Sequence, residues 1–153
     1  MTETMRLRLW TLAKIPLLFF LRPSVVEASD RSTVIRIPLT RRSRNHLGSM
    51  YFGALCAGAD LAGALTAMRR IDASGRRVSL IFKDVTARFL QRAEGDVLFS
   101  CEDGEAVAAL VRRAIESGER EELPVRIVAT VPEKLGAEPA AQFLLTLSLK
   151  RRD

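Results

Sequence analysis

The feature that most constrains this chain is a stretch of about 22 residues, from Met50 to Ile71, that contains no proline. Between Gly48 and Ala67 it carries one charged side chain, and it ends in a pair of arginines, which are favoured at a helix C-terminus. At ~1.5 Å per residue, a helix of this length is about 33 Å long. Because it is apolar or small on all sides, it must be buried on nearly every side, so the rest of the chain has to wrap around it.

The segments around this helix read mostly as strands. Alternating apolar and polar residues predict strands at 33–40, 78–91, 97–101, 124–132 and 141–150. The turn at 94–96 favours pairing of 78–91 with 97–101 as a hairpin. Residues 105–117 have the spacing of an amphipathic helix, with Asp103 and Gly118 as its caps. We therefore expect one α+β domain spanning 1–153. Its core, at about 30–150, is an antiparallel curved sheet of five or six strands around the long helix.

The N-terminal segment, about 4–22, is basic and then apolar. Its uninterrupted apolar run, Ile15 to Leu21, has only seven residues and contains Pro16. A bilayer span needs about 20 apolar residues, and no small-x-small cleavage site follows this run. The segment therefore predicts an amphipathic helix, kinked at Pro16, that packs on the domain. A peripheral membrane anchor through residues 5–21 is the alternative. We expect a cytoplasmic protein.

Composition excludes several classes of function. A single histidine, His46, allows no zinc cluster, and no Walker or G-x-S-x-G motif is present, so we expect neither a metal nor a redox cofactor. Cys56 and Cys101 lie in apolar stretches, which predicts buried thiols. The net charge of +6 favours an anionic partner. Nucleic acid is disfavoured, because the chain has one Trp and one Tyr and its basic residues do not alternate with aromatic ones.

Asp60 is the one carboxylate inside the long helix, and burying it unpaired would be costly. Its helical neighbours three, four and seven positions away are all small: Gly53, Cys56, Ala57, Gly63, Ala64 and Ala67. This stripe of missing side chains admits either a closely packed neighbour or a ligand. Asp60 is therefore a catalytic or ligand-binding candidate. The alternative is a structural aspartate paired with Lys83, Arg88 or a backbone amide.

The loop before the helix, Asn45-His46-Leu47-Gly48, is the second candidate region. Free backbone N–H groups at the helix start, including that of Gly53, suit a carbonyl oxygen that gains negative charge. Asn45 either orients a water or a carbonyl, or caps the helix. His46 is either a base or a surface residue.

The stretch from Asn45 to Leu55, followed by Asp60, resembles the signature of the hot-dog acyl-CoA thioesterases, in particular the phenylacetyl-CoA thioesterase group. The similarity is strongest to an uncharacterised branch that has an Asn-His-x-Gly start. Residues 89–96 resemble a hairpin of the same proteins. This resemblance implies a hot-dog fold with Asp60 as general base or nucleophile. It also implies Gly53 as an oxyanion-hole donor, assistance from Asn45, and substrate contacts at His46, Gly48 and Tyr51. The family's His-Gly-Gly is replaced here by Tyr51-Phe52-Gly53.

Gly53 and Asp60 lie about 10 Å apart along the helix axis, too far to act on one thioester carbon. We therefore expect a homodimer or homotetramer in which one subunit supplies Gly53 and another supplies Asp60. Arg41, Arg42 and Arg44 are either anchors for the phosphates of coenzyme A, present only as part of the substrate, or a solvated surface. The predicted function is hydrolysis of an acyl-CoA or acyl-carrier thioester. The alternative is a non-catalytic module that binds acyl-CoA or an acyl chain.

Overall fold

The computed structural model describes all 153 residues, which form five helices and six strands. The helices are α1 (Glu3–Lys14), α2 (Pro16–Phe20), α3 (Phe52–Ser74), α4 (Gly104–Ser117) and α5 (Pro132–Leu135). The strands are β1 (Ser24–Ala28), β2 (Thr33–Ile37), β3 (Val78–Phe89), β4 (Val97–Cys101), β5 (Glu121–Thr130) and β6 (Pro139–Arg151). No helix is long and apolar enough to cross a membrane.

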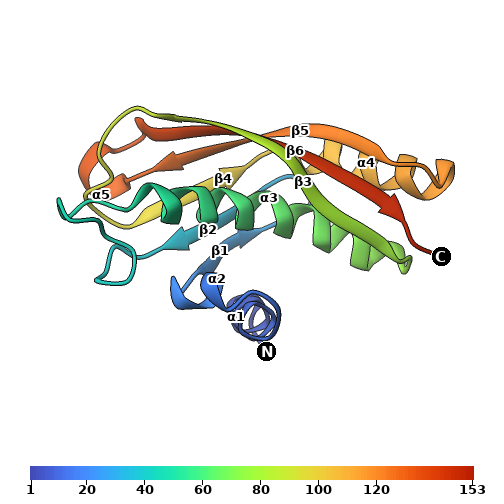
Figure 1. The fold of residues 1–153 in the computed structure, drawn as a ribbon, viewed down its shortest axis with the longest axis horizontal. Helices are drawn as coiled ribbons and strands as arrows, with labels where there is room; N and C mark the ends of the chain where they lie inside the picture. The colour runs from blue at the N-terminus through green and yellow to red at the C-terminus, as the bar shows by residue number, and fades with distance from the viewer.

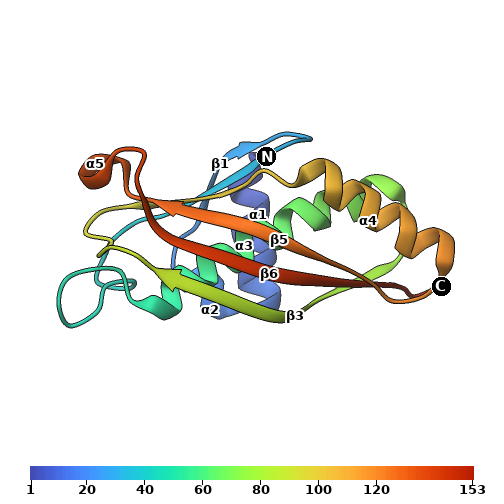
Figure 2. The same cartoon turned by 90° about the horizontal axis from the view of Figure 1, so that it is seen from above.

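The six strands form one antiparallel sheet in the order β1-β2-β4-β5-β6-β3. The sheet curves over α3, which runs along its concave side (Figure 1). Seen from above, β3 forms one edge of the sheet and β1 lies at the other (Figure 2). The predicted α+β hot-dog fold, with a curved sheet around a long central helix, is confirmed.

Helix α3 begins after Tyr51 and ends at Gly75, whose φ of 68° places it in the left-handed region that favours glycine. Eleven of its 23 residues are buried against the sheet and α4. The prediction that the helix is buried on nearly every side is therefore wrong, because the stripe that contains Asp60 is only half-buried. The packing is so close that a Cβ on Gly58 would lie 2.2 Å from the buried ring of Phe99. Only glycine allows β4 to approach the helix at this point.

The predicted hairpin between 78–91 and 97–101 is wrong. β3 pairs with β6 over most of its length, and β4 lies between β2 and β5 in the middle of the sheet. Length explains the difference: β3 has 12 residues and β6 has 13, whereas β4 has only five. A short partner would leave most of the backbone groups of β3 unpaired. The sequence also gave no signal for β1, a short strand that contains a bulge.

The N-terminal segment is helical and breaks at Ile15, as Pro16 predicts. Helix α1 packs on the domain through Leu7 and Thr11. Its Arg8 guanidinium also donates a hydrogen bond of 2.9 Å to the carbonyl of Pro23. The two helices lie on the far side of α3 from strands β3, β5 and β6, and α1 also contacts β1 (Figure 1).

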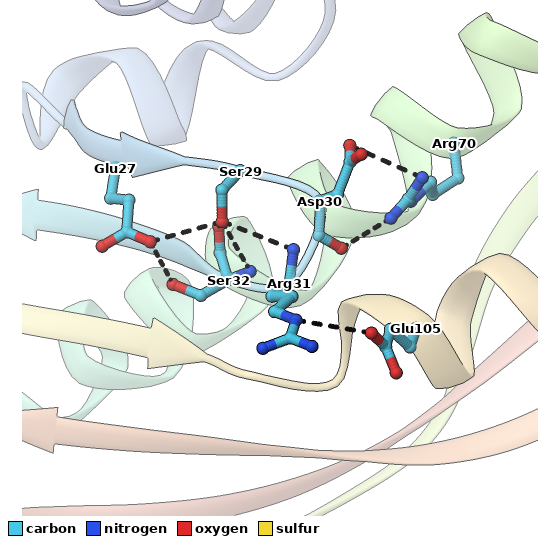
Figure 3. A network of polar contacts seen from close by, with 7 residues as sticks. All are labelled: Glu27, Ser29, Asp30, Arg31, Ser32, Arg70 and Glu105. Carbon is cyan, nitrogen blue, oxygen red and sulfur yellow. Dashed lines mark hydrogen bonds and ion pairs between the residues drawn. The ribbon is translucent and has the colours of Figure 1, made fainter.

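The turn between β1 and β2 contacts the helices α3 and α4 (Figure 3). The contact with α4 is an ion pair of 3.4 Å between Arg31 and Glu105. The Ser29 hydroxyl donates to Glu27 and accepts the backbone N–H groups of Arg31 and Ser32. The Arg70 guanidinium on α3 lies 3.6 Å from the Asp30 carboxylate and donates to its carbonyl. These contacts hold the β1 edge of the sheet against the body of the domain.

Candidate active site

Asp60 lies on the one stripe of α3 that is only half-buried. The stripe also contains Gly53, Cys56, Ala57, Ala64 and Met68. The Asp60 carboxylate accepts no hydrogen bond and forms no ion pair. The structural interpretation, in which Lys83 or Arg88 pairs with this carboxylate, is therefore wrong. The Lys83 ammonium instead donates a hydrogen bond of 3.1 Å to Glu122. Desolvation by burial raises the pKa of Asp60 to about 6.

The N-terminal end of α3 presents free hydrogen-bond donors. The N–H groups of Ala54 and Leu55 already donate to the Tyr51 carbonyl at 2.9 and 3.1 Å. Those of Phe52 and Gly53 have no acceptor in the chain, and no side chain caps the helix. The Tyr51 ring lies over Gly53, where a Cβ would be 2.3 Å from a ring carbon. A side chain at position 53 would therefore displace the half-exposed Tyr51 ring, whatever the Gly53 N–H binds.

The Asn45 side chain holds its own loop together. Its Oδ1 accepts hydrogen bonds from the N–H groups of Leu47 and Ser49, at 2.9 and 3.2 Å, and its Nδ2 donates to the Ser49 hydroxyl at 3.0 Å. Gly48, with a φ of 82°, supplies the left-handed turn that closes the loop. Asn45 does not cap α3, because the N-cap position belongs to Tyr51. Its Oδ1 and one of its two amide N–H groups are engaged within the loop, so only the second N–H is left for a water or a carbonyl.

An open groove of about 580 Å³ lies between this loop, the start of α3 and the segment after β3. It brings together Asn45, His46 and Tyr51 of the predicted site residues. Gly48, Gly53, Asp60 and the three arginines at 41, 42 and 44 do not line it. The other lining residues are Ser49, Met50, Phe52, Leu55, Phe89, Leu90, Gln91, Arg92 and Ala93.

Aromatic rings line one side of this groove and connect it to the core. Tyr51, Phe52, Phe89 and Phe143 form a chain of edge-to-face contacts with centroid distances of 4.9, 6.2 and 6.0 Å. Arg92 is a groove residue that the sequence reasoning missed. Its signal was its position inside the 89–96 stretch, which resembles a family hairpin.

The predicted arginine cluster lies on the loop that follows β2 and leads to α3. Arg41, Arg42 and Arg44 are exposed and form no ion pairs. The Arg42 guanidinium lies 5.1 Å from the centre of the Phe20 ring on α2. This contact joins the loop to the N-terminal helices.

The cysteines differ from one another. Cys101 is buried as predicted, but Cys56 is only half-buried, because it lies on the Asp60 stripe. Burial raises the pKa of both thiols, so both are protonated at neutral pH. No three His, Cys, Asp or Glu side chains gather closely enough to hold a metal ion.

The family model of a domain of unknown function, DUF4442, matches residues 5–142. The chain belongs to the DUF4442 family. No curated protein matches the sequence. Among solved structures, this DUF4442 domain is similar to the Chlorobaculum tepidum TLS protein OLEI01261, of unknown function. That match has 12% identity and a TM-score of 0.85, and covers 97% of this chain and 94% of the other.

Two further solved structures carry a description of activity. The Pseudomonas aeruginosa protein PA5026, described as a probable thioesterase, is 26% identical with a TM-score of 0.80, covering 99% of this chain and 97% of its own. The Haemophilus influenzae thioesterase HI1161 is 14% identical with a TM-score of 0.69, covering 99% and 92%. The shared architecture confirms that this DUF4442 domain has the fold of the thioesterase-like hot-dog superfamily. Membership of the Asn-His-x-Gly branch stays a prediction.

Proposed function

We propose that this DUF4442 domain hydrolyses an acyl thioester, with Asp60 as its general base or nucleophile. The observation that carries the proposal is the unpaired Asp60 carboxylate on a half-buried stripe of small residues, where its pKa is raised to about 6. A carboxylate without a partner destabilises the fold, and a raised pKa makes it a stronger base. The likeness to proteins described as thioesterases supports the same reaction class.

In the proposed reaction, the thioester carbonyl lies at the start of α3, where the N–H groups of Phe52 and Gly53 have no other acceptor. These donors stabilise the negative charge that develops on the carbonyl oxygen. Asp60 removes a proton from water as the water oxygen attacks the carbonyl carbon. The carbon–sulfur bond then breaks, and the departing thiolate takes up a proton to leave an acid and a thiol.

We further propose that the site is shared between two copies of the chain, because Gly53 and Asp60 of one copy lie about 10 Å apart along the helix. The unpaired edge of β3 is the proposed contact. It is 12 residues long, and its Val85 and Phe89 side chains are 53% and 47% exposed. An exposed apolar strand edge of this length is a template for pairing with another strand. A second copy along β3 would cover the Asp60 stripe and supply the missing donor.

The substrate that we propose is an acyl-CoA or acyl-carrier thioester. The aromatic side of the groove suits an apolar acyl chain, with His46 and Tyr51 as contacts. The guanidinium groups of Arg41, Arg42 and Arg44 suit the phosphates of coenzyme A or of a carrier's phosphopantetheine arm. The reaction needs no metal or redox cofactor. A cytoplasmic location is part of this proposal and fits the two free cysteines.

A non-catalytic module that binds acyl-CoA or an acyl chain is the second candidate. Two observations favour it: the Tyr51 ring covers Gly53, and the Asn45 amide is engaged within its own loop. Both features leave the N-terminal end of α3 less accessible to a carbonyl than the proposed reaction needs.

The test is hydrolysis across a panel of short, long and aromatic acyl-CoAs by the wild type and Asp60→Asn. Asp72→Asn is the matched control, because Asp72 is an exposed aspartate on the same helix. We expect Asp60→Asn to lose activity by roughly 100- to 1000-fold while Asp72→Asn keeps it. Equal activity in all three proteins would overturn the role of Asp60. Binding of acyl-CoA without turnover by any of them would establish the binding module.

A further inference from the structure

The outward face of α1 is apolar. Leu7 and Thr11, four residues apart, are the positions that this helix buries against the domain. Met5, Leu9 and Leu12 share the opposite face, at the spacing of four and three that places side chains in one row. They are 53%, 54% and 49% exposed. A helix that packs only on its own domain has the reverse pattern, with its apolar row turned inward.

Helix α2 extends the same exposed region. Leu17 is 69% exposed and Phe20 49%, and Ile15, at the break between the two helices, is 40% exposed. The helices contact each other and lie together on the outside of the domain (Figure 1). With Trp10, which is 36% exposed, seven large apolar side chains within 16 residues are therefore open to solvent. Isolated exposed apolar residues need no explanation, but a contiguous group of this kind marks an interaction surface.

The charge around this surface indicates what it contacts. The segment from Met1 to Val26 contains four basic residues, Arg6, Arg8, Lys14 and Arg22, against one acidic residue, Glu3. None of these four basic side chains forms an ion pair within the chain. Helical spacing places Arg6 and Arg8 on the two sides of the apolar row, whereas Lys14 lies on the face of Leu7 and Thr11. An apolar row flanked by cations matches the boundary between the headgroups and the acyl chains of an anionic bilayer.

A second copy of the chain fits this surface less well. In a two-fold contact the same face meets itself, so the free cations of one copy would approach those of the other. Such like-charge contacts oppose association, whereas anionic lipid headgroups compensate each of these charges. The charge complementarity therefore favours lipid over self-association.

We propose that the apolar row of Met5, Leu9 and Leu12, together with Leu17 and Phe20, docks this domain onto the surface of an anionic membrane. The helices lie in the plane of the interface, with their apolar side chains among the upper acyl chains and Arg6, Arg8 and Arg22 at the phosphate level. This docking is independent of thioester hydrolysis and does not use the groove or Asp60.

The experiment is co-sedimentation of the full chain with vesicles of phosphatidylcholine alone, or of phosphatidylcholine with about 30% phosphatidylglycerol. We expect binding to the anionic vesicles, little to the neutral ones, and weakening by salt. The double variant Leu9→Glu/Leu12→Glu should lose roughly tenfold or more in partitioning, because it removes two apolar side chains and adds two negative charges. Circular dichroism checks that it folds.

Leu144→Glu is the matched control. Leu144 is 43% exposed on β6, a strand on the other side of α3 from the N-terminal helices, and the change adds one negative charge to an exposed leucine, where the double variant adds two. It should bind vesicles as the wild type does. Arg6→Gln/Arg22→Gln gives a second variant that leaves the apolar row intact and should reduce the preference for anionic vesicles.

Three results would overturn the proposal: no binding to anionic vesicles, equal loss in the Leu144→Glu and Leu9→Glu/Leu12→Glu proteins, or unchanged binding in both helix variants. Analytical ultracentrifugation of the same proteins tests the alternative, in which a second copy of the chain covers this surface. If Leu9→Glu/Leu12→Glu halves the mass of the wild-type particle, the surface is an interface between copies of this chain and not a lipid contact.

Discussion

The two edges of the sheet are built in opposite ways. The β1 edge is five residues long, contains a bulge, and is held by α1 and by the polar network around its turn. The β3 edge is 12 residues long and pairs with β6 on one side, with no strand beyond it on the other. Below we call β1 with α1 and its turn the β1 flank, and β3 with the half-buried stripe of α3 the β3 flank.

The carboxylates also differ in whether they have hydrogen-bond partners within the chain. Asp96, at the turn before β4, accepts a hydrogen bond of 2.8 Å from the Leu39 N–H and one from the Arg36 guanidinium. Asp60, on the β3 flank, has no partner. Glu27 and Asp30 on the β1 flank likewise have partners within the chain, whereas Asp60 on the β3 flank has none. Native domains keep such features where a partner or a substrate completes them, which is why we place the proposed site on the β3 flank.

A negative charge introduced on each flank should give the largest difference between the two flanks in oligomeric state and activity. Val85 on β3 and Val26 on β1 are almost equally exposed, at 53% and 56%. If β3 pairs with a second copy, Val85→Asp buries an unpaired carboxylate in each half of the contact. We expect it to give monomers and to lower hydrolysis by about 100-fold or more at nanomolar enzyme.

Val26→Asp should leave both the mass and the activity unchanged, because the β1 flank needs no partner. Analytical ultracentrifugation and the acyl-CoA assay check both variants. Identical behaviour of the two proteins would show that the flanks do not differ in solution. A fully active wild-type monomer would disprove the shared site.

The packing of α3 should also differ between β3 and β4, a strand in the middle of the sheet, with a smaller effect than that of the charge substitutions. A Cβ at Gly58 would lie 2.2 Å from Phe99, whose ring is fully buried and has no space to move. Gly58→Ala should therefore cost about 1–3 kcal/mol in the free energy of unfolding. At Gly63, next to Phe82 of β3, the nearest atoms are 3.6 Å from the new Cβ, an ordinary contact.

Gly63→Ala should then be neutral, or stabilising by up to about 1 kcal/mol through higher helix propensity. Urea unfolding of both variants measures the difference. Equal destabilisation by the two substitutions would mean that β3 holds α3 as tightly as β4 does.

The two carboxylates should give stability profiles of opposite sign. Burial alone would raise the pKa of Asp96, but the hydrogen bonds from Leu39 and Arg36 outweigh it and hold that pKa below the ordinary value of 3.8. Asp96 therefore stabilises the fold above the unfolded pKa, and this contribution is lost as the pH falls through the lower folded pKa. Asp96→Asn should lower the Tm at pH 7 and converge with the wild type in strong acid.

Asp60 has a folded pKa of about 6 against the ordinary 3.8, so the folded state holds more protons between these values. The wild type should therefore lose stability as the pH rises through this window. Asp60→Asn lacks this loss, so its Tm should be higher than that of the wild type at pH 7 and equal to it below about pH 4. Tm measurements from pH 3 to 8 check both variants, and a lower Tm for Asp60→Asn at pH 7 would mean that its carboxylate has a stabilising partner in solution.

The sequence predicted much of the fold because most of its elements are patterned locally. The long helix is read from its uninterrupted apolar composition, and β6 from the alternation of Ala141, Phe143, Leu145, Leu147 and Leu149, which are all buried. The break at Pro16 follows from the geometry of proline. By contrast, the partner of β3 is not encoded near β3, since pairing depends on the length and register of strands far away in the chain.

The candidate site also combines features that the sequence predicts with features that depend on distant parts of the chain. The sequence by itself identified Asp60, because one charge among small residues is visible without coordinates. Only the tertiary structure decided that Asp60 has no partner, that the Asn45 amide is engaged within its loop, and that Arg92 lines the groove. It also turned the apolar row of α1 outward. These outcomes depend on which surfaces meet when the sheet closes over the helix, and a local pattern records what each residue prefers but not which neighbour it finds.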